Sequence, residues 1–272
     1  MTAYTYKPLK FFALTLLISW VAFSLAAYFS YQPGQEPLQM IVTIAGSNVP
    51  FIVGLFMIYG SGNSALKQDY PRRLLRVNRA GLWGLPTALL LFPAALMLAV
   101  AISVLFGKSA DQFKLVSELS LLIPILAPTF EELAWRGYGV DSLRSRYNLL
   151  QTSLLFSLVW GLWHVPMFFG NGYYQNELWQ MGIPYVLNFF VSLVPFTIIL
   201  NWLYYKTNRS ILTAILFHIV AVVAPEAFGV EESTKFMQTG ILLIVAAGIV
   251  VKDLAFFTAD ASPNPIDTRR AA

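Results

Sequence analysis

The segment FEELAWRGY, residues 130–138, closes a long apolar run with two adjacent carboxylates, Glu131 and Glu132, followed by an arginine. The chain has two histidines, His164 and His218, and each lies inside its own later apolar run. An ionisable side chain in a membrane-spanning helix costs about 3 kcal/mol on insertion scales, so such residues are functional candidates. We expect the three runs to meet and to bring these side chains together.

Composition indicates a membrane protein. The 272-residue chain is 57% hydrophobic and 12% charged, whereas soluble domains carry about 25% charged residues. Several uncharged runs exceed the roughly 18 residues that predict a membrane-spanning helix. Because backbone polar groups inside a bilayer must be bonded within helices, we expect an all-α polytopic membrane helix bundle. The absence of cysteine excludes disulfides, thiolate catalysis and cysteine metal sites.

The distribution of positive charge predicts the topology. Eight apolar segments fit as membrane-spanning helices, at residues 11–31, 38–59, 81–106, 115–136, 149–169, 183–205, 211–228 and 236–251. With the N-terminus in the cytoplasm, every lysine and arginine lies on the cytoplasmic side except Lys108, Lys114 and Lys235. This bias predicts about eight helices with both termini cytoplasmic. It also explains the net charge of +4 without a nucleic-acid partner.

The two glutamates are expected to differ in role. Adjacent helical residues point about 100° apart. Arg136 lies four residues after Glu132 and can pair with it, which leaves Glu131 to face the bundle interior as a possible general base. The alternative is an interfacial ion cluster where the helix leaves the membrane. Two other acidic residues, Glu118 and Glu226, fit the interfacial ends of their helices.

The two histidines and Glu131 can lie at overlapping depths, although His164 is deeper unless its helix begins in the cytoplasm. Trp160 and His164 share one helical face at a spacing of four, and the alternative role for His164 is a buried histidine bonded to another helix. Counting about 1.5 Å per residue puts His218 roughly 12 to 14 Å from Arg209, and Glu131 about 7 to 8 Å from the end of its helix at Arg136. We therefore expect one site that opens to the side on which the arginines lie.

These three motifs resemble the CPBP family of intramembrane endopeptidases, which includes CAAX proteases, bacteriocin-processing proteins and abortive-infection-like proteins. The EExxxR motif of the family is matched at residues 131–136, and FxxxH is matched at His164 with Trp160 in place of phenylalanine. The third motif is a histidine followed four residues later by asparagine or a similar residue. His218 matches, but Val222 occupies the polar position.

The resemblance divides the chain into three parts. Residues 115–228 form the protease-like core with helices four to seven. Residues 1–114 hold the first three helices and match no motif. Residues 229–272 hold the last helix and a polar cytoplasmic tail, of which residues 258–272 are expected to be disordered.

The resemblance also implies roles. Glu131 would activate the attacking water, His164 would hold it, and His218 would stabilise the oxyanion together with the polar residue of the third motif. Val222 cannot donate a hydrogen bond, so we consider Asn188 as its replacement. The expected supporting residues are Glu132, Arg136, Trp160 and Asn188.

A metal is an open alternative. One glutamate and two histidines form a legitimate three-ligand zinc set with a free fourth position. The chain lacks an HExxH motif, however, and the three residues come from separate helices. We favour hydrolysis that requires no cofactor, with a divalent metal such as zinc as the alternative.

The resulting prediction is an intramembrane endopeptidase that cleaves a peptide or membrane-protein substrate near the cytoplasmic face. The short chain favours a prokaryotic plasma membrane. One alternative is a non-catalytic membrane scaffold or immunity protein on the same fold, suggested by Val222. The other is a proton-coupled transporter, against which the sequence lacks an inverted repeat.

Overall fold

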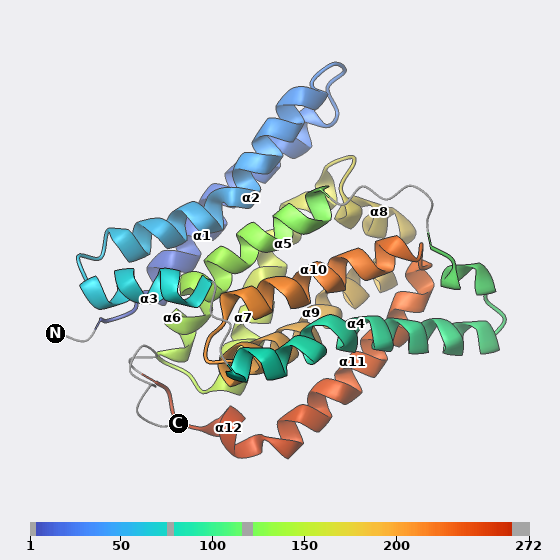
Figure 1. Ribbon diagram of the computed structural model, residues 1–272. Helices are drawn as coiled ribbons and strands as arrows, with labels where there is room; N and C mark the ends of the chain where they lie inside the picture. The colour runs from blue at the N-terminus through green and yellow to red at the C-terminus, as the bar shows by residue number, and fades with distance from the viewer. Residues whose placement is uncertain (1–3, 75–78, 116–121, 263–272) are drawn as a thin grey trace.

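A computed structural model describes residues 4–74, 79–115 and 122–262, and this part of the chain forms a bundle of helices without strands, as expected (Figure 1). Six of the described helical segments are long and apolar enough to cross a membrane. They are α1 (Pro8–Phe29), α2 (Glu36–Tyr59), α4 (Arg79–Leu105), α7 (Leu149–His164) with its 3₁₀ extension Val165–Phe169, α9 (Ile183–Lys206) and α11 (Glu232–Lys252). Each corresponds to one predicted span.

The remaining two predicted spans contain shorter helices, so the expected number of eight is approximate. These are α5 (Leu122–Ala134) and α10 (Ile211–Ala227), and they carry the glutamate pair and His218. The Ser210 side chain caps the start of α10 by accepting from the backbone N–H of Thr213, which replaces a missing intrahelical partner. Residues 116–121, including Glu118, and residues 263–272 lie outside the described residues.

Several short helices join the long ones. The segments are α3 (Ser64–Leu74), the 3₁₀ turn Ala110–Phe113, α6 (Val140–Arg144), α8 (Tyr174–Met181) and α12 (Leu254–Thr258). None was predicted, because hydropathy detects only long apolar runs. Helix α3, for example, has the polar sequence SALKQDYPRRL.

A π-helical turn, Trp135–Gly139, continues α5 directly after the glutamate pair. Its two glycines allow close packing. A Cβ atom on Gly137 would lie 2.8 Å from the Tyr70 ring, and one on Gly139 would lie 2.8 Å from the Phe11 ring. Atoms that close would overlap, so larger residues would push the turn away from α1 and α3. The glycines of this segment therefore fix where the end of α5 sits.

A buried ion network closes the bundle beside this turn. It joins Arg73 of α3 and Arg209, which precedes α10, to Asp69 and Asp141. Arg73 contacts Asp69 at 2.7 Å and Asp141 at 3.1 Å, and Arg209 contacts Asp69 at 3.0 Å and also Asp141. Burial raises the pKa of Asp141, but the charges of Arg209 and Arg73 outweigh it and hold that pKa below its usual value. We call this end of the bundle, with Arg73, Arg136 and Arg209, the arginine-rich end.

Both ends of the described chain lie at the arginine-rich end of the bundle. The Tyr4 hydroxyl lies 2.9 Å from that of Tyr138, and the backbone N–H of Ser262 donates to the carbonyl of Arg144 at 3.0 Å. Two ends on one side agree with an even number of membrane crossings. That this side is the cytoplasm stays a prediction from the loop charges.

Candidate active site

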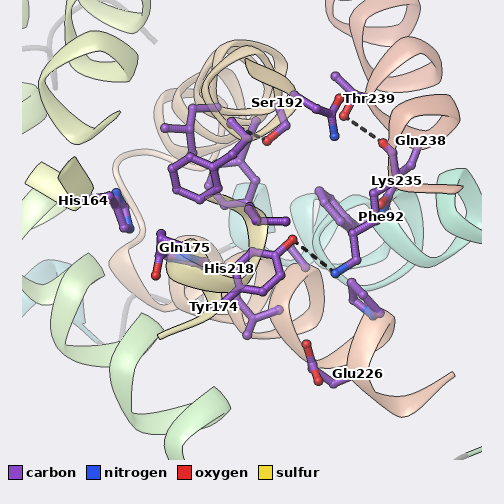
Figure 2. Close-up of a pocket in the computed structure, with 18 of the residues that line it drawn as sticks. Phe92, His164, Tyr174, Gln175, Ser192, His218, Glu226, Lys235, Gln238 and Thr239 are labelled. Carbon is purple, nitrogen blue, oxygen red and sulfur yellow. Dashed lines mark hydrogen bonds between the residues drawn. The ribbon is translucent and has the colours of Figure 1, made fainter. Parts of the chain in front are cut away.

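A cavity of about 750 Å³ lies between α5, α7, α8, α9, α10 and α11. Figure 2 shows it in close-up, with His164 and His218 facing it from different helices. Five of the candidate residues line this cavity: Glu131, Trp160, His164, Asn188 and His218. Residues that chain order could not connect are therefore neighbours in space.

One oxygen of Glu131 is held by two tryptophans. Its Oε2 accepts from Nε1 of Trp160 at 2.9 Å and from Nε1 of Trp135 at 3.2 Å. Within the described chain, Oε1 accepts no hydrogen bond, so it is available to a molecule in the cavity. The motif departure at Trp160 thus has a physical meaning, because phenylalanine has no N–H to donate.

Glu132 points away from the cavity and is fully buried. Its Oε1 accepts from Nη1 of Arg136 at 2.9 Å and from Nδ1 of His218 at 2.8 Å. The pair with Arg136 agrees with the predicted i, i+4 geometry. The contact with His218 was not predicted. It orients the imidazole ring so that Nε2 is the atom available to the cavity.

The hydrogen bonds of His164 define its available nitrogen as well. Its Nδ1 lies 2.7 Å from the backbone carbonyl of Trp160. A carbonyl can only accept, so Nδ1 carries the proton, and Nε2 of the neutral ring is an acceptor. The Trp160 ring contacts both histidine rings edge to face, with centroids 5.6 Å from His164 and 5.4 Å from His218. Trp160 therefore contacts all three predicted catalytic side chains.

The third motif is incomplete as expected. Val222 lines the cavity one turn beyond His218 and offers no polar atom. Asn188 faces the same cavity from α9. Within the described residues its side-chain amide has no hydrogen-bond partner, so it can bind a ligand.

The three predicted zinc ligands share a cavity. Among residues 4–74, 79–115 and 122–262, no group of three or more histidine, aspartate or glutamate side chains is arranged to hold a metal ion. Glu131 is bonded through Oε2 to two tryptophans, and His218 is bonded through Nδ1 to Glu132. These bonds engage Oε2 of Glu131 and Nδ1 of His218 and leave Oε1 and Nε2 free, so the zinc alternative stays a prediction.

The cavity extends away from the arginine-rich end. Its lining follows α5 from Glu131 back to Ile123 and α10 from His218 on to Glu226. We expected the site to open toward the arginines, whereas this cavity opens toward the opposite end, where Tyr174 of α8 and Lys235 of α11 form part of its wall (Figure 2).

Some residues of the site were missed in the sequence. Trp135 lies four residues after Glu131, so helical spacing could have identified it. Asn201 accepts from Nη2 of Arg136 at 3.0 Å and donates to Oγ of Ser153 at 3.1 Å. It is a polar residue inside an apolar span, which is itself a signal of function or of polar packing.

Comparisons with known proteins identify the family. A family model described as "Type II CAAX prenyl endopeptidase Rce1-like" matches residues 113–224. The chain is 37% identical over 265 residues to a protein named "CAAX prenyl protease 2" from Methanococcus maripaludis, and the match covers 94% of this chain and 98% of that protein. All five candidate residues that line the cavity lie within the part matched by the family model.

Proposed function

The chain belongs to the Rce1-like family of type II CAAX prenyl endopeptidases, and from this premise we propose that it hydrolyses a peptide bond within the membrane with water activated by Glu131. The observation that carries the proposal is the shared cavity, which is lined by Glu131, His164 and His218 from three different helices. The unbonded Oε1 of Glu131 supports its role as the base.

The attacking water lies between Oε1 of Glu131 and Nε2 of His164. Glu131 accepts a proton from the water while the water oxygen forms a bond to the carbonyl carbon of the substrate. When the tetrahedral intermediate collapses, the C–N bond breaks and the proton passes from Glu131 to the departing amine. General-base catalysis of this kind contributes about 100- to 10,000-fold.

The oxyanion is stabilised by His218 and Asn188. Because Nδ1 of His218 donates to Glu132, Nε2 donates to the oxyanion only when the ring is protonated. Glu132, 2.8 Å from Nδ1, is the counter-ion of the ring in that state. The amide of Asn188 supplies the donor that Val222 lacks, and one such donor is typically worth about 3 kcal/mol.

The substrate class follows from the relative. Its name indicates action on prenylated CAAX proteins, and we propose the same class for this chain. A CAAX sequence is a C-terminal motif that carries the prenyl group on its cysteine. Apolar and aromatic side chains, among them Phe92, Phe189 and Leu242, line much of the cavity and suit an isoprenoid chain. Ile123 lines the cavity and is 62% exposed, so the prenyl group can enter sideways from the bilayer.

The membrane side of cleavage is testable because the chain has no cysteine. The loop charges place the arginine-rich end in the cytoplasm, so we propose that Glu131 cleaves nearer that face. Single cysteines at Arg146, which is exposed at the arginine-rich end, and at Glu226, which is exposed at the cavity mouth, can be labelled with an impermeant maleimide. Labelling of R146C in intact cells and protection of E226C would reverse the proposed orientation.

The catalytic proposal is tested by the substitution Glu131→Gln. The amide cannot accept the proton of the water, so cleavage of a prenylated CAAX peptide should fall at least about 100-fold. Glu226→Gln is the matched control, because it removes a carboxylate at the mouth of the same cavity and should change the rate less than about threefold. If Glu131→Gln retained the wild-type rate, the glutamate mechanism would be wrong. If it also retained full biological function, a non-catalytic scaffold would be favoured.

A further inference from the structure

Gln238 of α11 is a buried residue with an unused hydrogen-bond donor. Its side chain lines the catalytic cavity, and the residue is 5% exposed. The amide nitrogen is buried and has no hydrogen-bond partner among the described residues. Leaving a buried donor unpaired costs about 1–3 kcal/mol, and such groups are few in native proteins. The missing partner is therefore expected to be a ligand.

Its place in the cavity sets Gln238 apart from other unpaired groups. In the described part of the chain, unpaired buried polar atoms also occur on residues such as Tyr6, Thr15 and Trp163, but none of these residues lines this cavity. Among the described residues that carry a buried, unpaired side-chain atom, Gln238 is the one that lines the catalytic cavity.

Two polar residues close to Gln238 on α11, Lys235 and Thr239, already have partners. The Thr239 hydroxyl donates to the backbone carbonyl of Lys235 at 2.9 Å. The Lys235 amine contacts Glu232 and donates to the Tyr174 hydroxyl at 3.3 Å, as Figure 2 shows for the latter pair. A shift of these groups toward Gln238 would break existing bonds, so they do not supply its partner.

The depth of Gln238 matches a peptide bound at the catalytic residues. Helix α10 continues for roughly 13–14 Å from His218 to its end, and α11 runs roughly 9 Å from its start to Gln238. A short turn joins the two helices, and, counted along the helix axes, Gln238 lies about 4–5 Å nearer to that turn than His218. An extended peptide advances about 3.3–3.6 Å per residue, so this offset corresponds to one or two residues.

We propose that Gln238 donates its side-chain N–H to a backbone carbonyl of the peptide substrate, one or two residues from the scissile bond. An isoprenoid chain has no acceptor, so the partner belongs to the peptide part of the substrate. The bond fixes the register in which the peptide lies beside Glu131. This inference rests on the proposed protease function and adds a substrate-binding residue to it.

The test measures binding without cleavage, in the Glu131→Gln protein. A fluorescent prenylated CAAX peptide is titrated against this protein with and without Gln238→Met. The variant keeps a side chain of similar length but removes the donor, and one hydrogen bond is worth about 0.5–1.5 kcal/mol. We expect binding to weaken about 3- to 10-fold while the unfolding temperature stays the same or rises, because an unpaired donor is removed.

Gln112→Met is the matched control. Gln112 is also buried, but its oxygen accepts from Thr234 at 2.7 Å, and its nitrogen donates to the Ser109 carbonyl at 3.2 Å. Its loss should lower the unfolding temperature and leave peptide binding unchanged. Equal binding by the proteins with and without Gln238→Met would overturn the inference, and so would failure of the parent protein to bind the peptide.

Modified peptides locate the carbonyl. Replacing the carbonyl one or two residues from the scissile bond by a methylene group should weaken binding to the Glu131→Gln protein. At one of these positions the same replacement should have no effect once Gln238 is methionine. If both proteins lost affinity equally at every position, Gln238 would not contact a carbonyl. If the proposed function is wrong, the Glu131→Gln protein will cleave the peptide at the wild-type rate. That cleavage assay is separate from the binding measurements, so the two failures can be told apart.

Discussion

The two ends of the bundle treat buried polar groups in opposite ways. At the arginine-rich end, Asp69 and Asp141 are paired with Arg73 and Arg209. In the cavity, Oε1 of Glu131 and the side-chain amides of Asn188 and Gln238 include atoms without a hydrogen-bond partner among the described residues. Paired groups hold the helices together, whereas unpaired groups facing a cavity are available to a substrate. Buried polar groups therefore stabilise the fold at one end of the bundle, and at the other end they are available to bind a substrate.

Adjacent glutamates connect these two regions. Glu131 faces the cavity, while Glu132 points into the packed interior and pairs with Arg136 and His218. Arg136 donates to Asn201, and Asn201 donates to Ser153. Buried hydrogen bonds therefore link α5, α7, α9 and α10. Hydrogen bonds therefore hold the site in place on the side of Glu132, and the cavity lies on the side of Glu131.

The largest effect is expected from Asp141→Asn. The change leaves Arg73 and Arg209 with one carboxylate between them, and removing one partner of a buried pair typically costs about 3–5 kcal/mol. The unfolding temperature in detergent should fall strongly, while the folded fraction keeps the wild-type rate of peptide cleavage.

A surface pair gives the control for this variant. Asp253 contacts Lys206 at 3.0 Å, and both side chains are partly exposed, so Asp253→Asn should cost about 0–1 kcal/mol. Equal destabilisation by the two variants would show that the network at the arginine-rich end does not stabilise the fold.

Much of the fold could be predicted because it depends on long apolar runs and on loop charges. All eight predicted segments contain a helix, and six are long enough to cross a membrane. The short helices could not be predicted, since α3 and α8 have no long apolar run. The position of the end of α5 could not be predicted either. Gly137 and Gly139 fix it through close contacts with Tyr70 and Phe11, which are distant in sequence.

The sequence indicated which residues belong to the candidate site but not how they contact one another. Ionisable residues in apolar runs identified Glu131, His164 and His218, and helical spacing identified the Glu132–Arg136 pair. The contact of His218 with Glu132 and the direction of the cavity depend on how helices pack. Neither follows from spacing along one helix, which is why the expected opening toward the arginines differs from the observed cavity.

The next effect concerns the oxyanion donor. Asn188→Ala should lower kcat about 100-fold, because removing one such donor costs about 3 kcal/mol, and it should leave stability nearly unchanged, since the amide has no protein partner. Adding Val222→Asn should restore part of the rate by returning a polar group to the third motif. If Asn188→Ala cleaved a prenylated peptide as fast as the wild type, Asn188 would have no role in catalysis.

A smaller effect is expected from Trp160→Phe. The ring is retained, but Glu131 loses the N–H donor at 2.9 Å. A hydrogen bond to a charged group is worth about 1.5–3 kcal/mol, so kcat should fall roughly 10- to 100-fold.

Trp163→Phe is the matched control, because the indole N–H of Trp163 is buried without a partner. This change should leave kcat within about threefold of the wild type. Equal rate losses in the two variants would indicate that packing, rather than the hydrogen bond to Glu131, determines the rate.

The central claim is that the cavity holds the scissile bond beside Glu131. The most direct measurement is an experimental structure of the Glu131→Gln protein with an uncleaved prenylated CAAX peptide. We predict that the scissile carbonyl carbon lies about 4–5 Å from the side chain of residue 131, a separation that admits one water molecule. A peptide bound outside this cavity, or with its scissile bond at the mouth beside Lys235, would contradict the claim.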